Sequence, residues 1–353
     1  MSEFEIAATN YRPLRYSHIK INPGADYVLT ADPWSYLHSQ LLKDLDSKRG
    51  KNRANKERAI FFLGLSQNFF RASDAAELPA KATLLYYGML NLVKVWLSVI
   101  GVELEKTIEH HGISLPLGKK HTLEVSGTGT GSISIFAEFA KALRTPVAAK
   151  EVFSLEDVIC RVPELHSTRK SLVPDEKQQF LSININFLTD AAHKKLLTCM
   201  SYDKKLEGLV QYAKILSGAR KGYFQDPENK DGKVLLKSKT VRTPANWKNL
   251  TRVYNTILDE YDEFNICSIL TRSGYQYYLD LKPGKYHHLC YTLMLMYYLG
   301  TAARYRPSAV KQILEGDLRQ SVTEACAICP RQFQYQLASR ITNSLCVIPY
   351  ARI

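Results

Sequence analysis

The apolar segment Ala82–Gly101 constrains the fold of this chain more than any other feature. It reads ATLLYYGMLNLVKVWLSVIG and is nearly long enough to cross a bilayer. Lys94 lies inside it and Asn91 adds a second polar group, and a charged side chain is costly in a hydrocarbon layer. The chain has no second segment of comparable length and apolarity. We therefore predict that this segment forms a buried central helix and that the protein does not enter a membrane.

Composition and charge narrow the class of protein and of partner. Hydrophobic residues make up 45% of the 353 residues, which predicts a sizeable core and excludes a wholly disordered chain. The net charge of +13 favours phosphate-rich partners: nucleic acid is the first candidate and an anionic membrane surface the second. A soluble cationic protein without such a partner could carry the same excess of basic residues. Seven cysteines and a polar segment 1–10 without a secretory pattern predict a cytoplasmic protein with buried thiols.

Helical periodicity dominates the pattern along the chain. Helices are expected near Asp32–Leu45, Ala54–Ala72, Pro79–Ile100 and Tyr286–Arg304, and short strands near 121–125, 183–187 and 275–281. The segment 190–217 is also expected to form one or two helices. The predicted fold is mainly α, with two helical lobes, each around one very apolar helix, and a few short β-strands. The predicted lobes are 1–148 and 149–353.

Four segments carry a resemblance to a known family. They are LLYYGMLNLVKVWL at 84–97, EHHGISL at 109–115, SLEDVICRVPEL at 154–165 and YTLMLMYYLGTAARYRP at 291–307. Together they resemble the YaaC-like family of bacterial proteins. The helices at about 54–101 also resemble the HEPN superfamily, all-helical nucleotide-binding domains that include ribonucleases. That second resemblance implies contact with nucleotides or nucleic acid, in a bacterial stress or phage-defence setting.

HEPN ribonucleases use an arginine and a histidine four to six residues apart, and two pairs here have that spacing. The first is Arg161 with His166, and the alternative is Arg12 with His18. An imidazole can act as acid or base on a ribose hydroxyl while a guanidinium stabilises phosphate charge. Both stretches contain proline, so neither forms a regular helical turn, and a capped helix end and an ordinary loop are the simpler interpretations.

The sequence Arg304-Tyr305-Arg306-Pro307 gives the strongest indication of a ligand site. Two guanidiniums beside a tyrosine ring suit a phosphate flanked by a base or sugar, although cations are also favoured at any helix C-terminus. Two basic stretches, 43–58 and 230–248, are further candidates, or else solvated surfaces. The residues expected to contact phosphate are Arg304, Tyr305, Arg306, Lys51, Arg53, Lys237 and Lys239.

Three other motifs have weaker functional interpretations. The glycine-rich turn 126–132 between a strand and a helix could hold an anion, but it departs from both known nucleotide fingerprints. Cys326 and Cys329 have metal-ligand spacing without two further clustered ligands, so two buried thiols are expected instead. The histidines that follow the central helix could shuttle protons or be structural; they are His110, His111 and His121.

The sequence thus predicts a nucleotide- or nucleic-acid-binding protein with no metal and no cofactor. One alternative is a metal-independent ribonuclease, and another is a non-catalytic subunit that binds a protein partner or a second copy of itself. Whether the chain is an enzyme stays open at this point.

Overall fold

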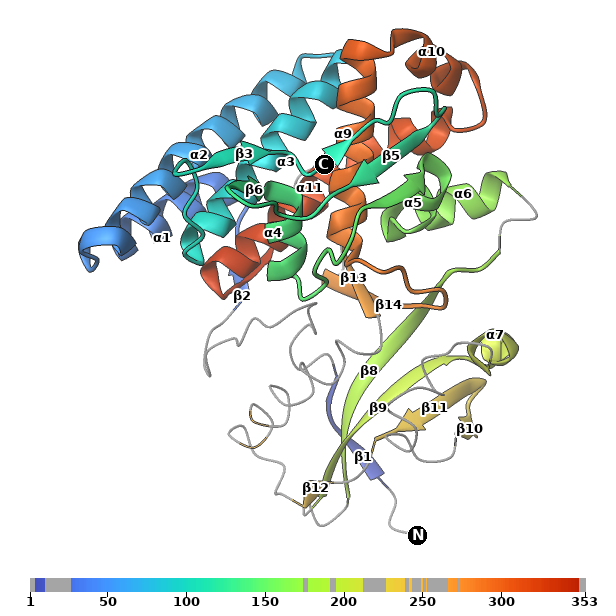
Figure 1. The fold of residues 1–353 in the computed structure, drawn as a ribbon. Helices are drawn as coiled ribbons and strands as arrows, with labels where there is room; N and C mark the ends of the chain where they lie inside the picture. Colours follow the sequence, from blue (N-terminus) through green and yellow to red (C-terminus); the bar gives the residue numbers. More distant parts are fainter. Residues whose placement is uncertain are drawn as a thin grey trace. The chain divides into compact units, whose positions relative to one another are not determined.

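A computed structural model describes residues 4–9, 27–173, 177–190, 195–211, 227–238, 241–242, 249, 252, 266–271 and 274–348. The chain divides into two compact units (Figure 1). We call Met1–Asp26 with Asp175–Pro283 the sheet unit, and Tyr27–Pro174 with Gly284–Ile353 the helical unit. The main segment of the sheet unit is therefore inserted in sequence between the two segments of the helical unit.

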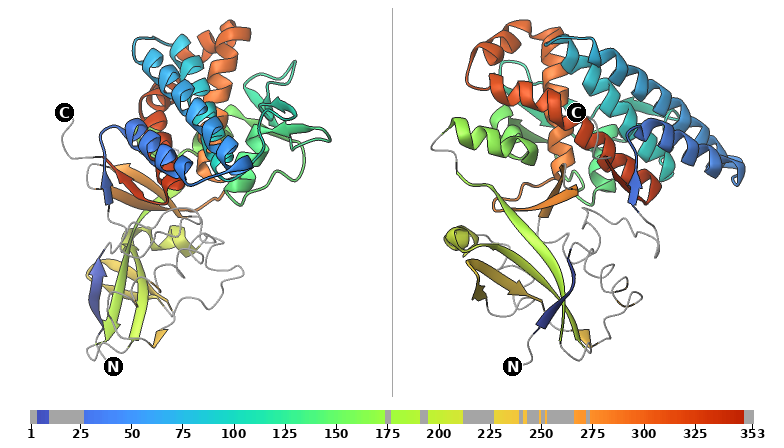
Figure 2. Two further views of the ribbon diagram at one scale, coloured as in Figure 1. Left: turned by 90° about the vertical axis from the view of Figure 1, so that its left-hand side faces the viewer. Right: turned by 180° about the vertical axis from the view of Figure 1, so that it is seen from behind.

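Six long helices build the helical unit: α1 (Pro33–Asp46), α2 (Gly50–Asp74), α3 (Ala80–Val99), α9 (His288–Tyr305), α10 (Pro307–Glu315) and α11 (Arg319–Thr342). Helix α3 packs against α2, α9 and α11, and α1 lies along α2 (Figure 2). By length and composition α3 could cross a membrane, and most of its residues are buried among its neighbours. The prediction of a buried central helix is confirmed, because α3 is apolar on every face and is covered on every side.

Small strands and short helices surround this bundle. Strand β2 (Tyr27–Leu29) pairs with β15 (Leu345–Val347), and β3 (Ile108–His110) pairs with β6 (Ser132–Ser134). A separate three-stranded sheet consists of β4 (Ile113–Ser114), β5 (Thr122–Val125) and β7 (Glu151–Ser154). The short helices are α4 (Ile135–Ala142), α5 (Leu155–Cys160), the 3₁₀ turn Pro163–Leu165 and α6 (His166–Leu172). Ser154 caps α5, because its Oγ accepts from the amide of Asp157 at 3.0 Å.

The sheet unit contains one eight-stranded antiparallel sheet. Its central order is β10-β11-β9-β8-β14-β13, and β1 and β12 pair with β8 and β9. The strands are β1 (Phe4–Thr9), β8 (Phe180–Asp190), β9 (Lys195–Asp203), β10 (Glu228–Lys230), β11 (Lys233–Lys237), β12 (Val241–Arg242), β13 (Ile266–Thr271) and β14 (Gly274–Asp280). Leu188, Leu197 and Cys199 form a buried cluster on this sheet. The 3₁₀ turn Lys204–Leu206 and helix α7 (Glu207–Gln211) follow β9.

The predicted mainly α fold is wrong, because the chain is a mixed α and β protein. The error is clearest at β9, which lies within a segment expected to be helical. Seven consecutive residues of this strand, Leu196–Tyr202, are buried, so side chains on both faces of the strand are covered. Such a strand shows a continuous apolar run without alternation, and periodicity alone does not distinguish that run from a buried helix.

Candidate functional site

Arg304 lies in the last turn of α9 with an exposed side chain. Its Nη1 donates to the hydroxyl oxygen of Tyr87 at 3.0 Å, and its Nε donates to the carbonyl oxygen of Gly300 at 3.3 Å. The guanidinium carbon lies 5.2 Å from the centre of the Tyr87 ring and 4.9 Å from that of Tyr305, which is 71% exposed. In the described part of the chain, no carboxylate forms an ion pair with Arg304. Two aromatic rings therefore flank a positive charge that no acid neutralises.

Arg306, two residues further on, has a different environment. Its Nη2 donates to the carbonyl oxygens of Leu115 and Pro116 at 2.9 and 2.8 Å, and its Nη1 reaches that of Lys119 at 3.4 Å. Arg306 therefore holds the loop between β4 and β5 against the end of α9. That loop carries the exposed side chains of Lys119 and Lys120, for which the described ranges contain no ion-pair partner. We call Tyr87, Lys119, Lys120, Arg304, Tyr305 and Arg306 together the Arg304 surface.

A buried tyrosine and a histidine lie beside this surface. The Oη of Tyr86 and the Nδ1 of His111 form a short hydrogen bond, and their rings stack at 5.6 Å between centres. Burial, assisted by Tyr297 and Tyr87, raises the pKa of the Tyr86 hydroxyl well above its usual range. Burial, followed by the charges of Lys94 and Arg304, lowers the pKa of His111. Tyr86 therefore keeps its proton and His111 is neutral at neutral pH, with one ring nitrogen able to donate and the other able to accept a hydrogen bond.

Segments that are far apart in the sequence meet at this place. Tyr86 and Tyr87 come from α3, His111 follows β3, and Arg304 ends α9. The two tyrosines belong to the segment 84–97, the histidine to 109–115 and the arginine to 291–307, and these segments resemble one family. A model of the YaaC-like protein family matches residues 27–341.

This chain belongs to the YaaC-like family. The predicted membership is thus confirmed, and the match spans nearly all of the helical unit and the inserted segment of the sheet unit. None of the curated proteins and none of the solved structures compared with this YaaC-like chain matches it. The HEPN resemblance and the phage-defence setting stay predictions.

The structure describes one of the two predicted arginine–histidine pairs. Arg161 follows α5 and His166 begins α6, with the turn Pro163–Leu165 between them. The Arg161 guanidinium lies over the ring of Tyr291, 5.6 Å from its centre, which is a packing contact. Arg12 and His18 lie outside the described residues. A catalytic role for either pair stays a prediction.

Three of the basic residues expected to contact phosphate form ion pairs with acids. Lys51 forms an ion pair with Glu103 at 2.5 Å and Arg53 with Glu57 at 3.0 Å, both in the helical unit. Lys237 of the sheet unit forms an ion pair with Glu228 at 2.7 Å. Lys239 lies outside the described residues. Phosphate binding by Lys51, Arg53, Lys237 and Lys239 stays a prediction. Arg304 differs from the first three of these residues, because it has no acidic partner among the residues that the structure describes.

The remaining motifs are accounted for by packing and capping. Cys326 and Cys329 are buried in α11, and burial raises the pKa of both thiols, that of Cys326 to about 12. His121 Nδ1 bonds the hydroxyl of Tyr298 at 3.0 Å. The glycine-rich turn 126–132 leads through β6 to α4, whose N-cap Ser134 accepts from the amide of Ala137. Within the described ranges, no group of three histidine, cysteine or acidic residues is placed to hold a metal ion.

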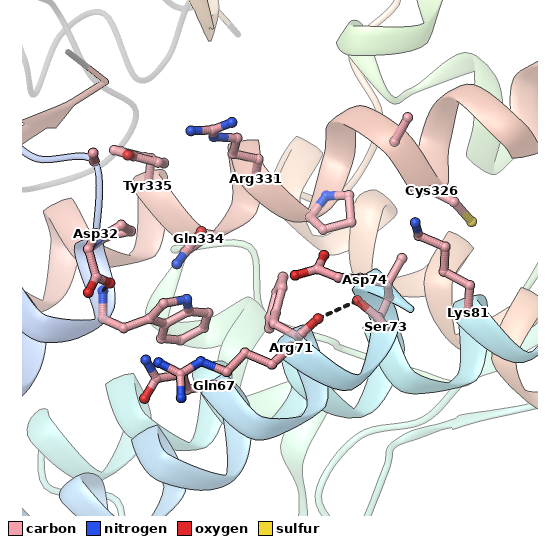
Figure 3. A pocket seen from close by; sticks show the side chains of 17 residues that line it. Asp32, Gln67, Arg71, Ser73, Asp74, Lys81, Cys326, Arg331, Gln334 and Tyr335 are labelled. Carbon is pink, nitrogen blue, oxygen red and sulfur yellow. Dashed lines mark hydrogen bonds between the residues drawn. The ribbon is translucent and has the colours of Figure 1, made fainter. Parts of the chain in front are cut away.

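Sequence reasoning missed a cavity of about 620 Å³ in the helical unit (Figure 3). It lies between the start of α1, the last turns of α2, the first turns of α3 and the middle of α11. Its charged lining residues are Asp32, Arg71, Asp74, Lys81 and Arg331. The signal was present only as helical spacing, since lining residues recur three or four apart on α2 and α11. Nothing in the sequence indicated that these two faces oppose each other.

Proposed function

We propose that this YaaC-like protein binds phosphate groups of a nucleotide or a nucleic acid at the Arg304 surface. One observation carries the proposal: the exposed guanidinium of Arg304 has no acidic partner in the described chain and lies between the rings of Tyr87 and Tyr305. A guanidinium binds phosphate oxygens through paired N–H donors, and an exposed ring stacks on a base or a sugar. The combination suits a nucleotide better than an inorganic anion.

The surroundings of Arg304 add to its attraction for phosphate. Lys119 and Lys120 supply two further cations on the loop that Arg306 holds in place. A neutral His111 beside this surface offers one donor and one acceptor nitrogen without a charge of its own. The net charge of +13 brings polyanions to the protein at long range, and the Arg304 surface gives them a defined contact.

Metal-independent cleavage of RNA is a second candidate, and one observation favours it. His111 and Arg304 both contact the ring of Tyr87, with the imidazole centre 6.2 Å and the guanidinium carbon 5.2 Å from the centre of that ring. An imidazole and a guanidinium at one phosphate are the groups that proton transfer and charge stabilisation require. Incubation of a labelled RNA with the protein in a chelator would show cleavage, and His111→Ala would abolish it.

Binding of labelled single-stranded RNA, measured by fluorescence anisotropy over a series of salt concentrations, tests the main proposal. The logarithm of the association constant falls with the logarithm of salt concentration, with a slope set by the number of phosphates contacted. Arg304→Gln is expected to weaken binding about tenfold at low salt and to reduce that slope by about one contact. The same slope and affinity in Arg304→Gln would refute the proposal.

Arg49→Gln is the matched control. Arg49 immediately precedes α2, its side chain is exposed, and the described residues include no acidic partner for it. The substitution removes the same charge from the chain, so a purely long-range effect would appear equally in both variants. We expect Arg49→Gln to bind RNA as the unaltered protein does, because it lies away from the Tyr87 and Tyr305 rings.

A further inference from the structure

The cavity of the helical unit combines charges of both signs with an aromatic wall. Trp34 and Phe70 line it with their rings 5.1 Å apart at 58°. Asp32 and Asp74 contribute carboxylates, and the cationic lining residues are Arg71, Lys81 and Arg331. Its volume of about 620 Å³ lies within the range of pockets that hold small organic ligands, about 300–1,000 Å³.

The charged side chains that line this cavity are not held in ion pairs with one another. Of the lining residues, all of which the structure describes, no carboxylate and cation form an ion pair within 4 Å. An exposed ion pair contributes only about 0–1 kcal/mol, so these side chains have little reason to pair with one another and stay accessible from solvent. Arg71 and Asp74 come from successive turns of α2 and Lys81 from the start of α3, so the helices fix their positions around the hollow (Figure 3). Both signs of charge are left available to a ligand.

Asp32 stays ionised for a local reason. Its carboxylate caps α1, where it accepts from the amides of Trp34 and Ser35 and from the Ser35 hydroxyl. Burial by itself raises the pKa of Asp32, but these hydrogen bonds and the charge of Arg71 outweigh it, so the pKa is lowered. The cavity therefore presents a fixed negative charge at one end, beside the ring of Trp34.

We propose that this cavity binds a zwitterionic small molecule of the amino-acid or short-peptide class. The ammonium group would lie against Asp74, and the carboxylate against Arg71. Trp34 and Phe70 would cover an apolar side chain. A zwitterion matches both signs of charge in the lining, whereas a phosphate-rich ligand would leave Asp32 and Asp74 beside further negative charge. This site is separate from the nucleotide-binding surface proposed above and contains none of its residues.

A thermal-shift screen of the full chain with the twenty amino acids and a set of alanyl dipeptides, each at about 10 mM, is the first test, since a ligand of the folded state raises the melting temperature. The strongest binder is then measured by calorimetry beside its N-acetylated and C-amidated derivatives. Each derivative lacks one charge and is expected to bind about tenfold more weakly or worse. The proposal would be overturned if no compound in the screen raised the melting temperature, or if both derivatives bound as tightly as the unmodified ligand. Stabilisation by inorganic pyrophosphate through the same residues would also overturn it.

Two charge variants assign the ends of the ligand. In Asp74→Asn, acetylation of the amine should no longer weaken binding, because its partner is gone; in Arg71→Gln, amidation of the carboxylate should no longer matter. Both side chains are exposed, so neither change threatens the core. Variants that retain the full sensitivity to both modifications would show that the ligand binds elsewhere.

A neutral variant separates occupancy from charge. Ala327 lines the cavity with an exposed side chain, and Ala327→Phe places a ring in the hollow without changing any charge. We expect loss of the thermal shift with an unaltered circular dichroism spectrum. Arg304→Gln serves as the control for the other site and should leave this binding unchanged. Retained binding in Ala327→Phe, or lost binding in Arg304→Gln, would count against the cavity as the site.

Discussion

Replacement of Arg306 by lysine should destabilise the helical unit although the charge is kept. The guanidinium spans three carbonyl oxygens of the loop after β4, at 2.8, 2.9 and 3.4 Å. A lysine ammonium is a single point and cannot bridge the same set. Arg306→Lys therefore keeps long-range attraction for phosphate but loses the fixed position of the loop that carries Lys119 and Lys120.

The magnitude follows from the hydrogen bonds that are lost. A hydrogen bond to a charged group contributes about 1.5–3 kcal/mol to stability, and lysine retains at most one of the two short ones. The Arg306 side chain is half-buried and its bond to Lys119 is long, so each hydrogen bond that is lost contributes at the lower end of that range. We expect a loss of about 2 kcal/mol, which lowers the melting temperature of a unit this size by about 4–8 °C.

Differential scanning calorimetry of the full chain, followed by the RNA-binding assay, measures both consequences. Arg49→Lys is the matched control at an exposed arginine without an acidic partner in the described ranges, and it should change stability by less than about 0.5 kcal/mol. A melting temperature for Arg306→Lys equal to that of the control would refute the inference that these carbonyl bonds hold the loop. Reduced stability with unchanged RNA affinity would separate the loop from the phosphate site.

Two further predictions concern the core of the helical unit. Gly300→Ala should destabilise the unit by about 1–3 kcal/mol, because a Cβ there would lie 3.1 Å from backbone atoms of Ala82 and Thr83. Gly64→Ala in α2 is the control: its Cβ would meet nothing within 4 Å, so it should stabilise the unit by up to about 1 kcal/mol. If chemical denaturation showed equal changes in stability for both variants, the inferred close approach of α3 and α9 would be contradicted. Burial raises the pKa of Glu164 from 4.5 to about 7, so the folded state holds the extra proton and stability falls as pH rises from 4.5 to 7. Glu164→Gln should therefore be more stable than the unaltered protein above pH 7, by up to about 3 kcal/mol, and equally stable near pH 4. A stability difference between the two proteins that did not change with pH would refute this prediction.

The sequence was a good guide where a single helix determined its own environment. The segment 82–101 is apolar on every face, so burial on every side followed directly, and α3 is buried in that way. The caps at Asp32 and Ser154 were also predictable, because each depends on residues within one turn. The sheet was not, since β9 is apolar at consecutive positions and its pairing with β8 and β11 is visible only in three dimensions.

The candidate sites show the same limit at the level of single side chains. Arg304 could be nominated from its place at the end of an apolar helix, beside a tyrosine. Its contact with Tyr87 joins residues 217 positions apart, and no local pattern reports such a pair. The histidine that lies beside it, His111, was one of three candidates and had no nominated partner. The cavity was missed altogether because it needs α2 and α11 to oppose each other.

Arg304 and Arg306 show why a motif cannot assign roles by composition alone. Both are arginines of one four-residue motif, and net charge counts them equally. Pro307 disfavours a helical backbone at the preceding residue, and Arg306 accordingly leaves the helix with φ of −140° and ψ of 56°. Its side chain then meets the loop carbonyls, whereas Arg304 remains on the helix surface between two rings. The backbone turn imposed by one proline thus separates a guanidinium that holds the loop in place from one that stays exposed on the helix surface.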